Sequence, residues 1–238
     1  MSNRLIIPLM ALGIVVAGCQ SAPDHSPSSP FRVLYNSDLT HIRTCISPYY
    51  KAGEEFNIDM LKASIDEAAD AGCDAHMLAP LFTYVPAWKS KIYPIEEHIE
   101  WLKSRFPGIE ISDYLKCLAE GTDIVGVYVD RCKEKGIAPF ISVRINDWHT
   151  REWIGCPPDT KLNWYPPHGL DKWRSTHPEY WVADAEERAA AESLLTDDRK
   201  ADFRRYSELS GILRDQRTLN WRYDAVRERM FGFIREIC

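Results

Sequence analysis

Polar side chains cluster directly after one apolar segment in the middle of the chain. Residues 137–143 (IAPFISV) have the composition of a buried strand, and Arg144, Asn146, Asp147 and His149 follow it. In α/β barrels and open α/β sheets, ligands bind at the carboxyl ends of the strands. A guanidinium binds a carboxylate or a diol, an amide both donates and accepts, and Asp or His can transfer a proton. The cluster therefore predicts a site for a polar ligand. The alternative is an ion pair between Arg144 and Asp147 that only braces the loop.

Two further predicted strands carry polar residues near their carboxyl ends. Asn36 ends the strand predicted over residues 31–36, and Asp38 follows it. His76 lies within the strand predicted over residues 73–79. Three such strand ends in one parallel sheet would line a shared pocket. For His76 the alternative is a hydrogen-bonded histidine of the core.

The segment after the second predicted strand is rich in aromatic residues. Trp88 and Tyr93 have flat apolar faces on which a sugar ring can stack, and Lys89 can reach a hydroxyl or an acidic group. This pattern predicts that the loop forms part of a sugar site. The alternative is a loop that covers the sheet by burying its aromatic side chains.

The strand ends also supply two acids, Asp38 and Asp147, which are the candidates for catalytic carboxylates. Nothing in their spacing marks them as a pair. No His, Cys or Glu spacing indicates a metal site, and neither a G-x-S-x-G nor a Walker motif is present. The sequence therefore predicts neither a metal nor a cofactor.

The elements that would position these residues alternate between strand and helix. Asn57 can cap a helix that ends before Gly72, and another helix is predicted over residues 123–135, before Gly136. Strands and helices that alternate with short αβ turns indicate a parallel sheet. Long polar connections after the strands favour a (β/α)8 barrel (TIM barrel) whose site is built from those connections. A doubly wound sheet also fits, although the glycine-rich turn typical of it is absent.

Shorter elements fill the rest of the chain. The sequence predicts short helices around residues 95–102 and within 171–181, a charged helical insertion near 184–205, and a last amphipathic helix over 223–237. Only about three to four of the eight β/α units of a barrel are present. We therefore expect residues 31–238 to form a partial barrel, either truncated or completed by a partner chain, because an open half-barrel has unpaired sheet edges. The alternative is a small complete sandwich of about three strands.

The amino terminus has the features of a bacterial lipoprotein signal. The apolar stretch from Leu5 to Val16 is shorter than the about 20 residues that a membrane-spanning helix needs. Small residues lead to Cys19, so residues 1–19 resemble a lipobox signal whose cysteine becomes lipidated. The Ser- and Pro-rich residues 20–30 are typical of a flexible tether. We expect a lipid-anchored protein of the cell envelope, and Gln20 favours the outer membrane.

Charge and cysteine usage limit the function classes. The net charge of −6 argues against nucleic-acid binding, which needs a basic face. The seven cysteines include no C-x-x-C motif. Cys45, Cys117 and Cys156 lie in loop-like sequence, where a disulfide can form in an oxidising envelope.

Five segments of the sequence resemble the same group of known proteins. They are Val33–Asp38, Ala75–Pro80, Val85–Lys91, Asp130–Gly136 and Ser142–Asp147. Together they resemble the amino-terminal half of bacterial envelope proteins identified as glycoside-hydrolase-like (β/α)8 barrels. Leu219–Trp221 and the helix after it are similar to the segment that leads into a fourth strand with acidic residues in those proteins.

This resemblance implies a domain that acts on carbohydrate or binds it. Its sugar site would include Asn36, Asp38, His76, Trp88, Lys89, Arg144, Asn146, Asp147 and His149. Glycosidases generally use two carboxylates, and in such barrels these come from the fourth strand end onward, beyond Cys238. We therefore expect this chain alone to hydrolyse no glycoside. The alternatives are a non-enzymatic carbohydrate-binding or scaffold lipoprotein and a non-functional remnant.

Overall fold

The computed structural model describes residues 32–38, 54–145, 147, 149–150, 153–154, 167–193 and 217–238. Several predictions fall outside these residues. They are the signal and lipobox with Cys19, the tether, Cys45, Asn146, Cys156 and the second half of the charged insertion.

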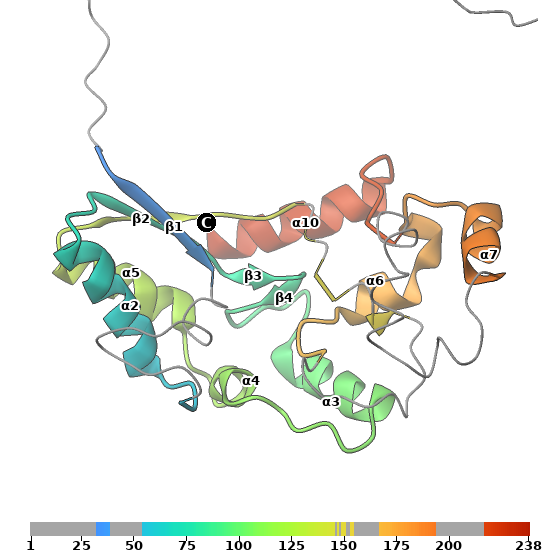
Figure 1. Cartoon of the computed structure of the whole chain (residues 1–238), viewed down its shortest axis with the longest axis horizontal. Helices are drawn as coiled ribbons and strands as arrows, with labels where there is room; N and C mark the ends of the chain where they lie inside the picture. Colours follow the sequence, from blue (N-terminus) through green and yellow to red (C-terminus); the bar gives the residue numbers. More distant parts are fainter. Residues whose placement is uncertain are drawn as a thin grey trace, which may run out of the picture. The chain divides into compact units, whose positions relative to one another are not determined.

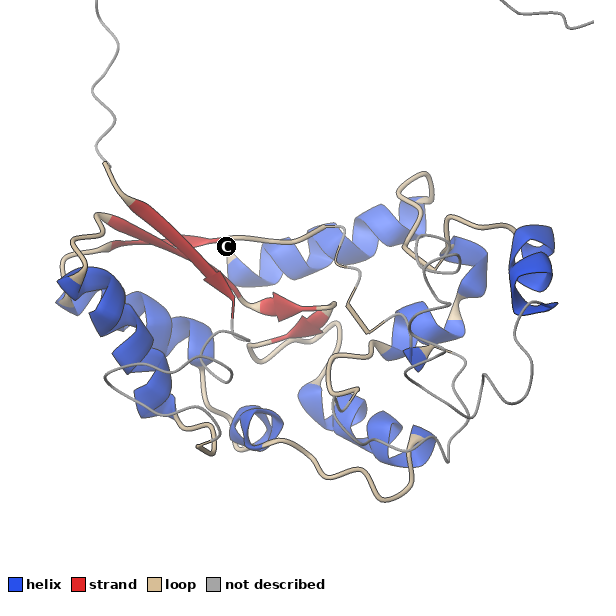
Figure 2. Cartoon of the chain, in the orientation of Figure 1, coloured by secondary structure: helices blue, strands red, loops and turns tan. Residues whose placement is uncertain are grey.

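The centre of the described chain is a parallel sheet of three strands (Figures 1 and 2). Its strands are β1 (Leu34–Asp38), β2 (Ala75–Ala79) and β5 (Ala138–Ile141), in the order β1-β2-β5. Asn36 pairs with Met77, which pairs with Phe140 on the other side. Because paired residues of neighbouring strands point to the same face, these three side chains share one face of the sheet.

Two helices cover the other face of the sheet (Figure 1). They are α2 (Ile58–Asp70), which Asn57 caps through its side chain, and α5 (Ile124–Glu134), which Asp123 caps in the same way. Both caps are residues whose side-chain oxygen satisfies amide donors of the first helical turn. Arg131 of α5 donates two hydrogen bonds to the carboxylate of Asp66 in α2, at 2.8 and 2.6 Å. This bidentate pair fixes the two helices side by side.

Both helices end where the sequence predicts, at glycines with left-handed backbones. Gly72 has φ of 80° and Gly136 has φ of 71°, which a residue with a Cβ adopts only with strain. The strand bounds differ from the prediction. β1 begins and ends later than residues 31–36, and both β2 and β5 are shorter than the apolar runs that contain them. Apolar runs therefore mark where the strands lie but not where their ladders end.

The long connection between β2 and α5 contains elements that the sequence only partly predicts. The two-stranded antiparallel hairpin of β3 (Leu81–Phe82) and β4 (Val85–Pro86) comes first. The helices α3 (Ile95–Arg105) and α4 (Asp113–Ala119) follow, and α4 is absent from the sequence prediction. Ser112 caps α4, and Tyr114, Leu115 and Leu118 of this helix are buried. With only seven residues, α4 is too short to show a helical repeat in the sequence.

The carboxyl-terminal part is helical. It contains α6 (Lys172–Thr176), a 3-10 turn (Pro178–Tyr180), α7 (Ala185–Ser193) and α10 (Asp224–Ile237). Before α10, Leu219 forms one isolated antiparallel bridge with Trp181. α10 buries Val226, Met230 and Phe233, and its Glu236 side chain accepts hydrogen bonds from the segment after β4. These contacts connect the end of the chain to its middle.

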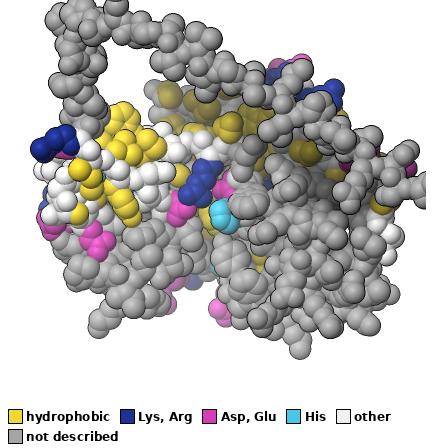
Figure 3. All heavy atoms as spheres, turned by 45° about the horizontal axis from the view of Figure 1, so that its top comes forward, with side chains coloured by type: hydrophobic (Ala, Val, Ile, Leu, Met, Phe, Trp, Pro, Cys, Tyr) yellow, Lys and Arg dark blue, Asp and Glu magenta, His cyan; other side chains and the backbone are white. Residues whose placement is uncertain are grey.

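The fold is mixed α/β, and within the described residues the sheet does not close into a barrel. The face opposite α2 and α5 exposes Leu34 (48 %) and Phe140 (38 %). Figure 3 shows hydrophobic side chains gathered on this side of the molecule, with basic, acidic and histidine side chains beside them. We call this the open face of the sheet.

Two other sequence predictions concern cysteines and membranes. Cys117, a candidate for a disulfide, has a free thiol. No helix in the described ranges has the length and apolar character needed to cross a membrane.

Candidate functional site at the strand ends

Asp38 and Arg144 form an ion pair at the carboxyl edge of the sheet. Asp38 is the last residue of β1, and Arg144 follows β5 across the sheet. Their Oδ2 and Nη2 atoms lie 2.6 Å apart, and both side chains are partly exposed. The alternative considered from the sequence, an ion pair between Arg144 and Asp147, is therefore wrong, because Arg144 pairs with Asp38 of another strand. This pair connects the two outer strands of the sheet at the predicted site.

Asp147 binds His149 instead. Oδ1 of Asp147 lies 2.6 Å from Nδ1 of His149 and also accepts from the backbone N–H of His149 at 3.0 Å. Oδ2 of Asp147 accepts from the backbone N–H of Thr83, in the β3–β4 turn, at 3.3 Å. The carboxylate is buried, with 2 % of its side chain exposed, whereas 46 % of the His149 side chain is exposed. A buried acid thus orients a histidine that faces solvent.

This contact determines the tautomer of His149. An ionised carboxylate only accepts hydrogen bonds, so Nδ1 of His149 carries a proton and Nε2 is the acceptor of the neutral ring. The hydrogen bond with Asp147 raises the pKa of His149 above its ordinary value, although burial opposes it. Burial alone would raise the pKa of Asp147, but the hydrogen bonds from His149 and Thr83 lower it below its ordinary value. Catalytic Asp–His pairs use the same arrangement to hold an imidazole for proton transfer.

The two pairs belong to one cluster. The charges of Arg144 and Asp38 both act on His149, the first lowering its pKa and the second raising it. The ring of Phe82 lies 6.3 Å from that of His149. The cluster therefore combines two acids, two bases and an aromatic ring near the open face.

A buried arginine that the sequence did not indicate as functional holds the loop in place. Arg174 of α6 is fully buried. It donates to the carbonyl oxygens of Asp147 (3.3 Å) and His149 (2.9 Å) and to Oγ1 of Thr150 (3.0 Å). A guanidinium that satisfies several buried acceptors rigidifies the backbone that carries them. The only sequence signal was its place in the predicted short helix within residues 171–181.

The backbone around this loop is strained. Thr83, Tyr84 and Thr150 have φ of 50°, 73° and 62°, and they are the non-glycine residues with positive φ in the part of the chain that is described. Thr83 donates to Asp147, the Tyr84 hydroxyl donates to the carbonyl of Ile145 at 3.3 Å, and Thr150 follows His149. Each such residue costs on the order of 1–3 kcal/mol and persists only where surrounding contacts enforce it. Strain of this kind gathers at functional sites, and here all of it borders the Asp147–His149 pair.

The structure does not bring all predicted site residues into this cluster. His76 is fully buried on the face covered by α2 and α5. There it contacts Oγ of Ser37 at 2.8 Å and stacks on Tyr35. Because side chains alternate along a strand, His76 points away from the face that holds Asn36 and Asp38. The alternative of a hydrogen-bonded core histidine describes this residue correctly.

The predicted aromatic platform is also wrong. Trp88 is 8 % and Tyr93 is 3 % exposed, and Nε1 of Trp88 donates to Glu236 at 3.1 Å. The loop covers the core by burying its rings, as the alternative predicts. Lys89 is exposed on this loop. Asn36 is exposed on β1 and shares a face with Asp38, while Asn146 lies outside the described residues.

The arrangement offers groups that can bind a polar ligand. Ion-paired Arg144 and Asp38 present donors and acceptors, Nε2 of His149 can accept or donate a proton, and Phe140 supplies an apolar surface on the same face.

Among the described residues no group of three or more His, Cys, Asp and Glu side chains could hold a metal ion. Comparison of the chain with models of known protein families and with curated proteins gives no match.

Proposed function

We propose that the Asp38–Arg144 and Asp147–His149 cluster binds carbohydrate. The observation that carries the proposal is the meeting of these two pairs at the carboxyl edge of parallel strands, beside an open apolar face. Sugars have apolar ring faces and a rim of hydroxyls, so they fit sites that combine an apolar floor with paired donors and acceptors. The cluster offers both within one edge of the sheet.

We further propose that the domain follows the pattern of a partial (β/α)8 barrel of the glycoside-hydrolase-like kind. In support, the three parallel strands are neighbours in their chain order, and their covering helices lie on one face. The polar cluster also lies at the carboxyl ends of the strands, where such barrels bind ligands. In this proposal a partner chain or a further part of the protein covers the open face.

We do not propose that this cluster hydrolyses glycosides. A glycosidase needs one carboxyl group that stays protonated at working pH and donates to the leaving oxygen. The hydrogen bonds to Asp147 lower its pKa, so this group is ionised. The carboxylate of Asp38 already accepts from the guanidinium of Arg144. Binding without hydrolysis is therefore the proposed activity.

A second candidate function is acid–base catalysis at a substrate hydroxyl, and the Asp147–His149 contact favours it. The group that transfers the proton would be Nε2 of His149. Measurable turnover on a glycan or glycan-ester panel that is lost in His149→Gln would favour this enzyme over the binding protein.

The binding proposal is tested by calorimetric titration of the full chain in detergent with a panel of neutral oligosaccharides. We expect at least one to bind and the variant Arg144→Gln to weaken its binding at least about tenfold, since a charged hydrogen bond is worth about 1.5–3 kcal/mol. The matched control is Lys89→Gln, because Lys89 is exposed and outside the cluster. An affinity that Arg144→Gln leaves unchanged would refute the assignment of the site.

The proposed location is the cell envelope, with lipid on Cys19. It rests on the signal-like residues 1–19 and is tested separately from sugar binding. Mass spectrometry of the mature protein should find an acylated Cys19 at its amino terminus, and Cys19→Ala should release the protein from the membrane fraction. An unmodified Cys19 in a membrane-free protein would contradict it.

A further inference from the structure

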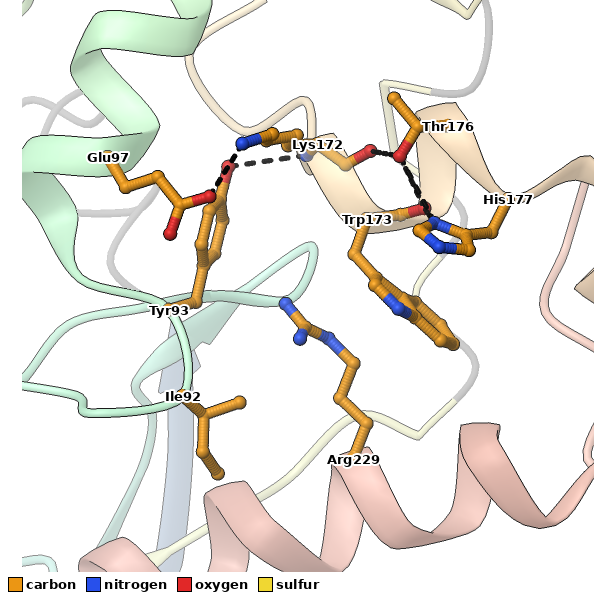
Figure 4. Close-up of a pocket in the computed structure, with 8 residues that line it drawn as sticks. All are labelled: Ile92, Tyr93, Glu97, Lys172, Trp173, Thr176, His177 and Arg229. Carbon is orange, nitrogen blue, oxygen red and sulfur yellow. Dashed lines mark hydrogen bonds and ion pairs between the residues drawn. The ribbon is translucent and has the colours of Figure 1, made fainter.

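A cavity of about 240 Å³ lies away from the strand ends, between α6, α10 and the start of α3 (Figure 4). Its lining includes Tyr93, Glu97, Lys172, Trp173, His177 and Arg229. None of these residues belongs to the cluster around Asp147 and His149. The cavity is smaller than the ~300–1,000 Å³ of pockets for drug-sized ligands, so it admits a molecule of about one ring.

Arg229 is a charged group of this cavity that lacks hydrogen-bond partners among the described residues. Only 15 % of its side chain is exposed, and its guanidinium lies 5.5, 5.0 and 5.1 Å from the ring centres of Tyr93, Trp173 and Phe233. It donates no hydrogen bond to any described residue, and its Nε atom is buried without a partner. The rings stabilise the cation but accept none of its directed donors. A largely buried guanidinium with unused donors indicates a missing acceptor.

Its nearest acid does not supply that acceptor. Asp171 is fully buried, and its Oδ1 atom lies 3.8 Å from Nη2 of Arg229, which is longer than a hydrogen bond. This Oδ1 atom also has no hydrogen-bond partner among the described residues. Burial raises the pKa of Asp171, although the charge of Arg229 opposes this shift.

The other charged side chains of the cavity and the Tyr93 hydroxyl already have partners. Lys172 donates to Glu97 at 2.7 Å. His98 must donate from Nε2 to the carbonyl of His168, so its Nδ1 accepts from the Tyr93 hydroxyl. That hydroxyl also accepts from the backbone N–H of Lys172 at 3.3 Å. Among the charged groups that line the cavity, the unused hydrogen-bond donors are therefore those of Arg229.

We propose that this cavity binds a small carboxylate through the guanidinium of Arg229. The planar guanidinium matches a carboxylate in a bidentate way, and the three rings hold it in one orientation. Lys172 is already paired with Glu97, so the charge left for a ligand is that of Arg229, which a singly charged carboxylate matches and a doubly charged phosphate exceeds. The available space fits an acid with a single ring, such as a uronic acid.

Calorimetric titration of the full chain in detergent tests this with four probes: sodium glucuronate, sodium acetate, glucose and inorganic phosphate. We expect glucuronate to bind, acetate to bind more weakly, and glucose and phosphate not to bind. Arg229→Lys keeps the charge beside Asp171 but loses the planar fork, and it should weaken glucuronate at least tenfold. The matched control, Arg235→Lys, changes an exposed arginine of the same helix and should leave the affinity unchanged.

A second readout uses the unaltered chain, so it does not depend on the folding of a variant. The ¹⁵N-edited NMR signal of Arg229 Nε–H should shift on addition of glucuronate and stay in place on addition of glucose. No binding of either carboxylate would overturn the proposal. So would phosphate affinity equal to that of glucuronate, or glucuronate binding that leaves the Arg229 signal unmoved.

Discussion

The Nδ1 atom of His149 lies 2.6 Å from the Oδ1 atom of Asp147, and the first side chain is half exposed while the second is buried. This contact joins a solvent-facing imidazole to a carboxylate that the protein fixes from three further sides. Thr83 donates to that carboxylate, the backbone of His149 donates to it, and Arg174 holds the carbonyl of its residue. The pair is thus a preorganised group at the edge of the sheet.

The stability contributed by His149 should fall as the pH rises. Its pKa is raised above the ordinary value of 6.5, so the folded state binds the proton more tightly than the unfolded chain. The contribution is complete below about pH 6.5 and is lost as the pH rises through the raised pKa. The free-energy difference between wild type and His149→Gln, measured by urea unfolding from about pH 5 to about pH 9, should therefore shrink.

The control for this prediction is the same comparison in the Asp147→Asn background. Without the carboxylate, the stability difference between the protein that keeps His149 and its His149→Gln variant should no longer fall with rising pH. A difference that grows with pH in the wild-type background would contradict the assigned contact.

Replacing Arg174 should destabilise the protein strongly. Arg174→Met leaves the carbonyls of Asp147 and His149 and the hydroxyl of Thr150 without their buried donor. We expect a loss of about 3 kcal/mol in the free energy of unfolding. Chemical denaturation followed by circular dichroism measures it, and exposed Arg222→Met, at the other end of the carboxyl-terminal part, should cost less than about 0.5 kcal/mol. Equal effects of the two variants would show that the bonds of Arg174 contribute nothing.

Glu236 should hold α10 against the segment after β4. Its carboxylate accepts from Nε1 of Trp88, Oγ of Ser90 and the backbone N–H groups of Lys91 and Ile92. Glu236→Ala should lower the free energy of unfolding by about 2 kcal/mol and raise the exposure of Trp88, seen as a red shift of tryptophan fluorescence. Glu228→Ala, an exposed position on the same helix, is the control. An unchanged fluorescence maximum in Glu236→Ala would count against this anchoring role.

The strain at Thr83 should be measurable as stability. Thr83 is buried with φ of 50°, a region that disfavours a β-branched residue. Glycine relieves the strain and alanine does not, so Thr83→Gly should be more stable than Thr83→Ala by about 1 kcal/mol. Thermal unfolding of the two variants measures this difference. A more stable alanine variant would show that the turn is not strained.

The sequence predicted a parallel sheet of alternating strands and helices because two local signals agree. Asn57 marks the start of one helix as its cap, and Gly72 and Gly136 mark the ends of two helices. It could not predict α4 or the β3–β4 hairpin, whose few residues show no repeat. Short elements depend on burial against distant residues, which local patterns do not contain.

The site was predicted in part for a similar reason. The sequence places Asn36 and Asp38 at the end of one predicted strand and Arg144 after another, but it does not tell which side of β2 carries a buried histidine. The Asp38–Arg144 pair spans 106 residues, and the contact between Arg174 and Asp147 spans 27. Partners at such separations follow from the strand order and from the packing of α6, which the sequence pattern leaves open.

The most direct test of carbohydrate binding at the strand ends is the ring NMR spectrum of His149 during titration of the full chain with neutral oligosaccharides. The proposal predicts that a bound oligosaccharide shifts the Nε2 resonance of His149, and that the shift disappears in Arg144→Gln at the same ligand concentration. An oligosaccharide that binds by calorimetry while the His149 resonances stay in place would contradict the proposal, as would the absence of binding across the panel.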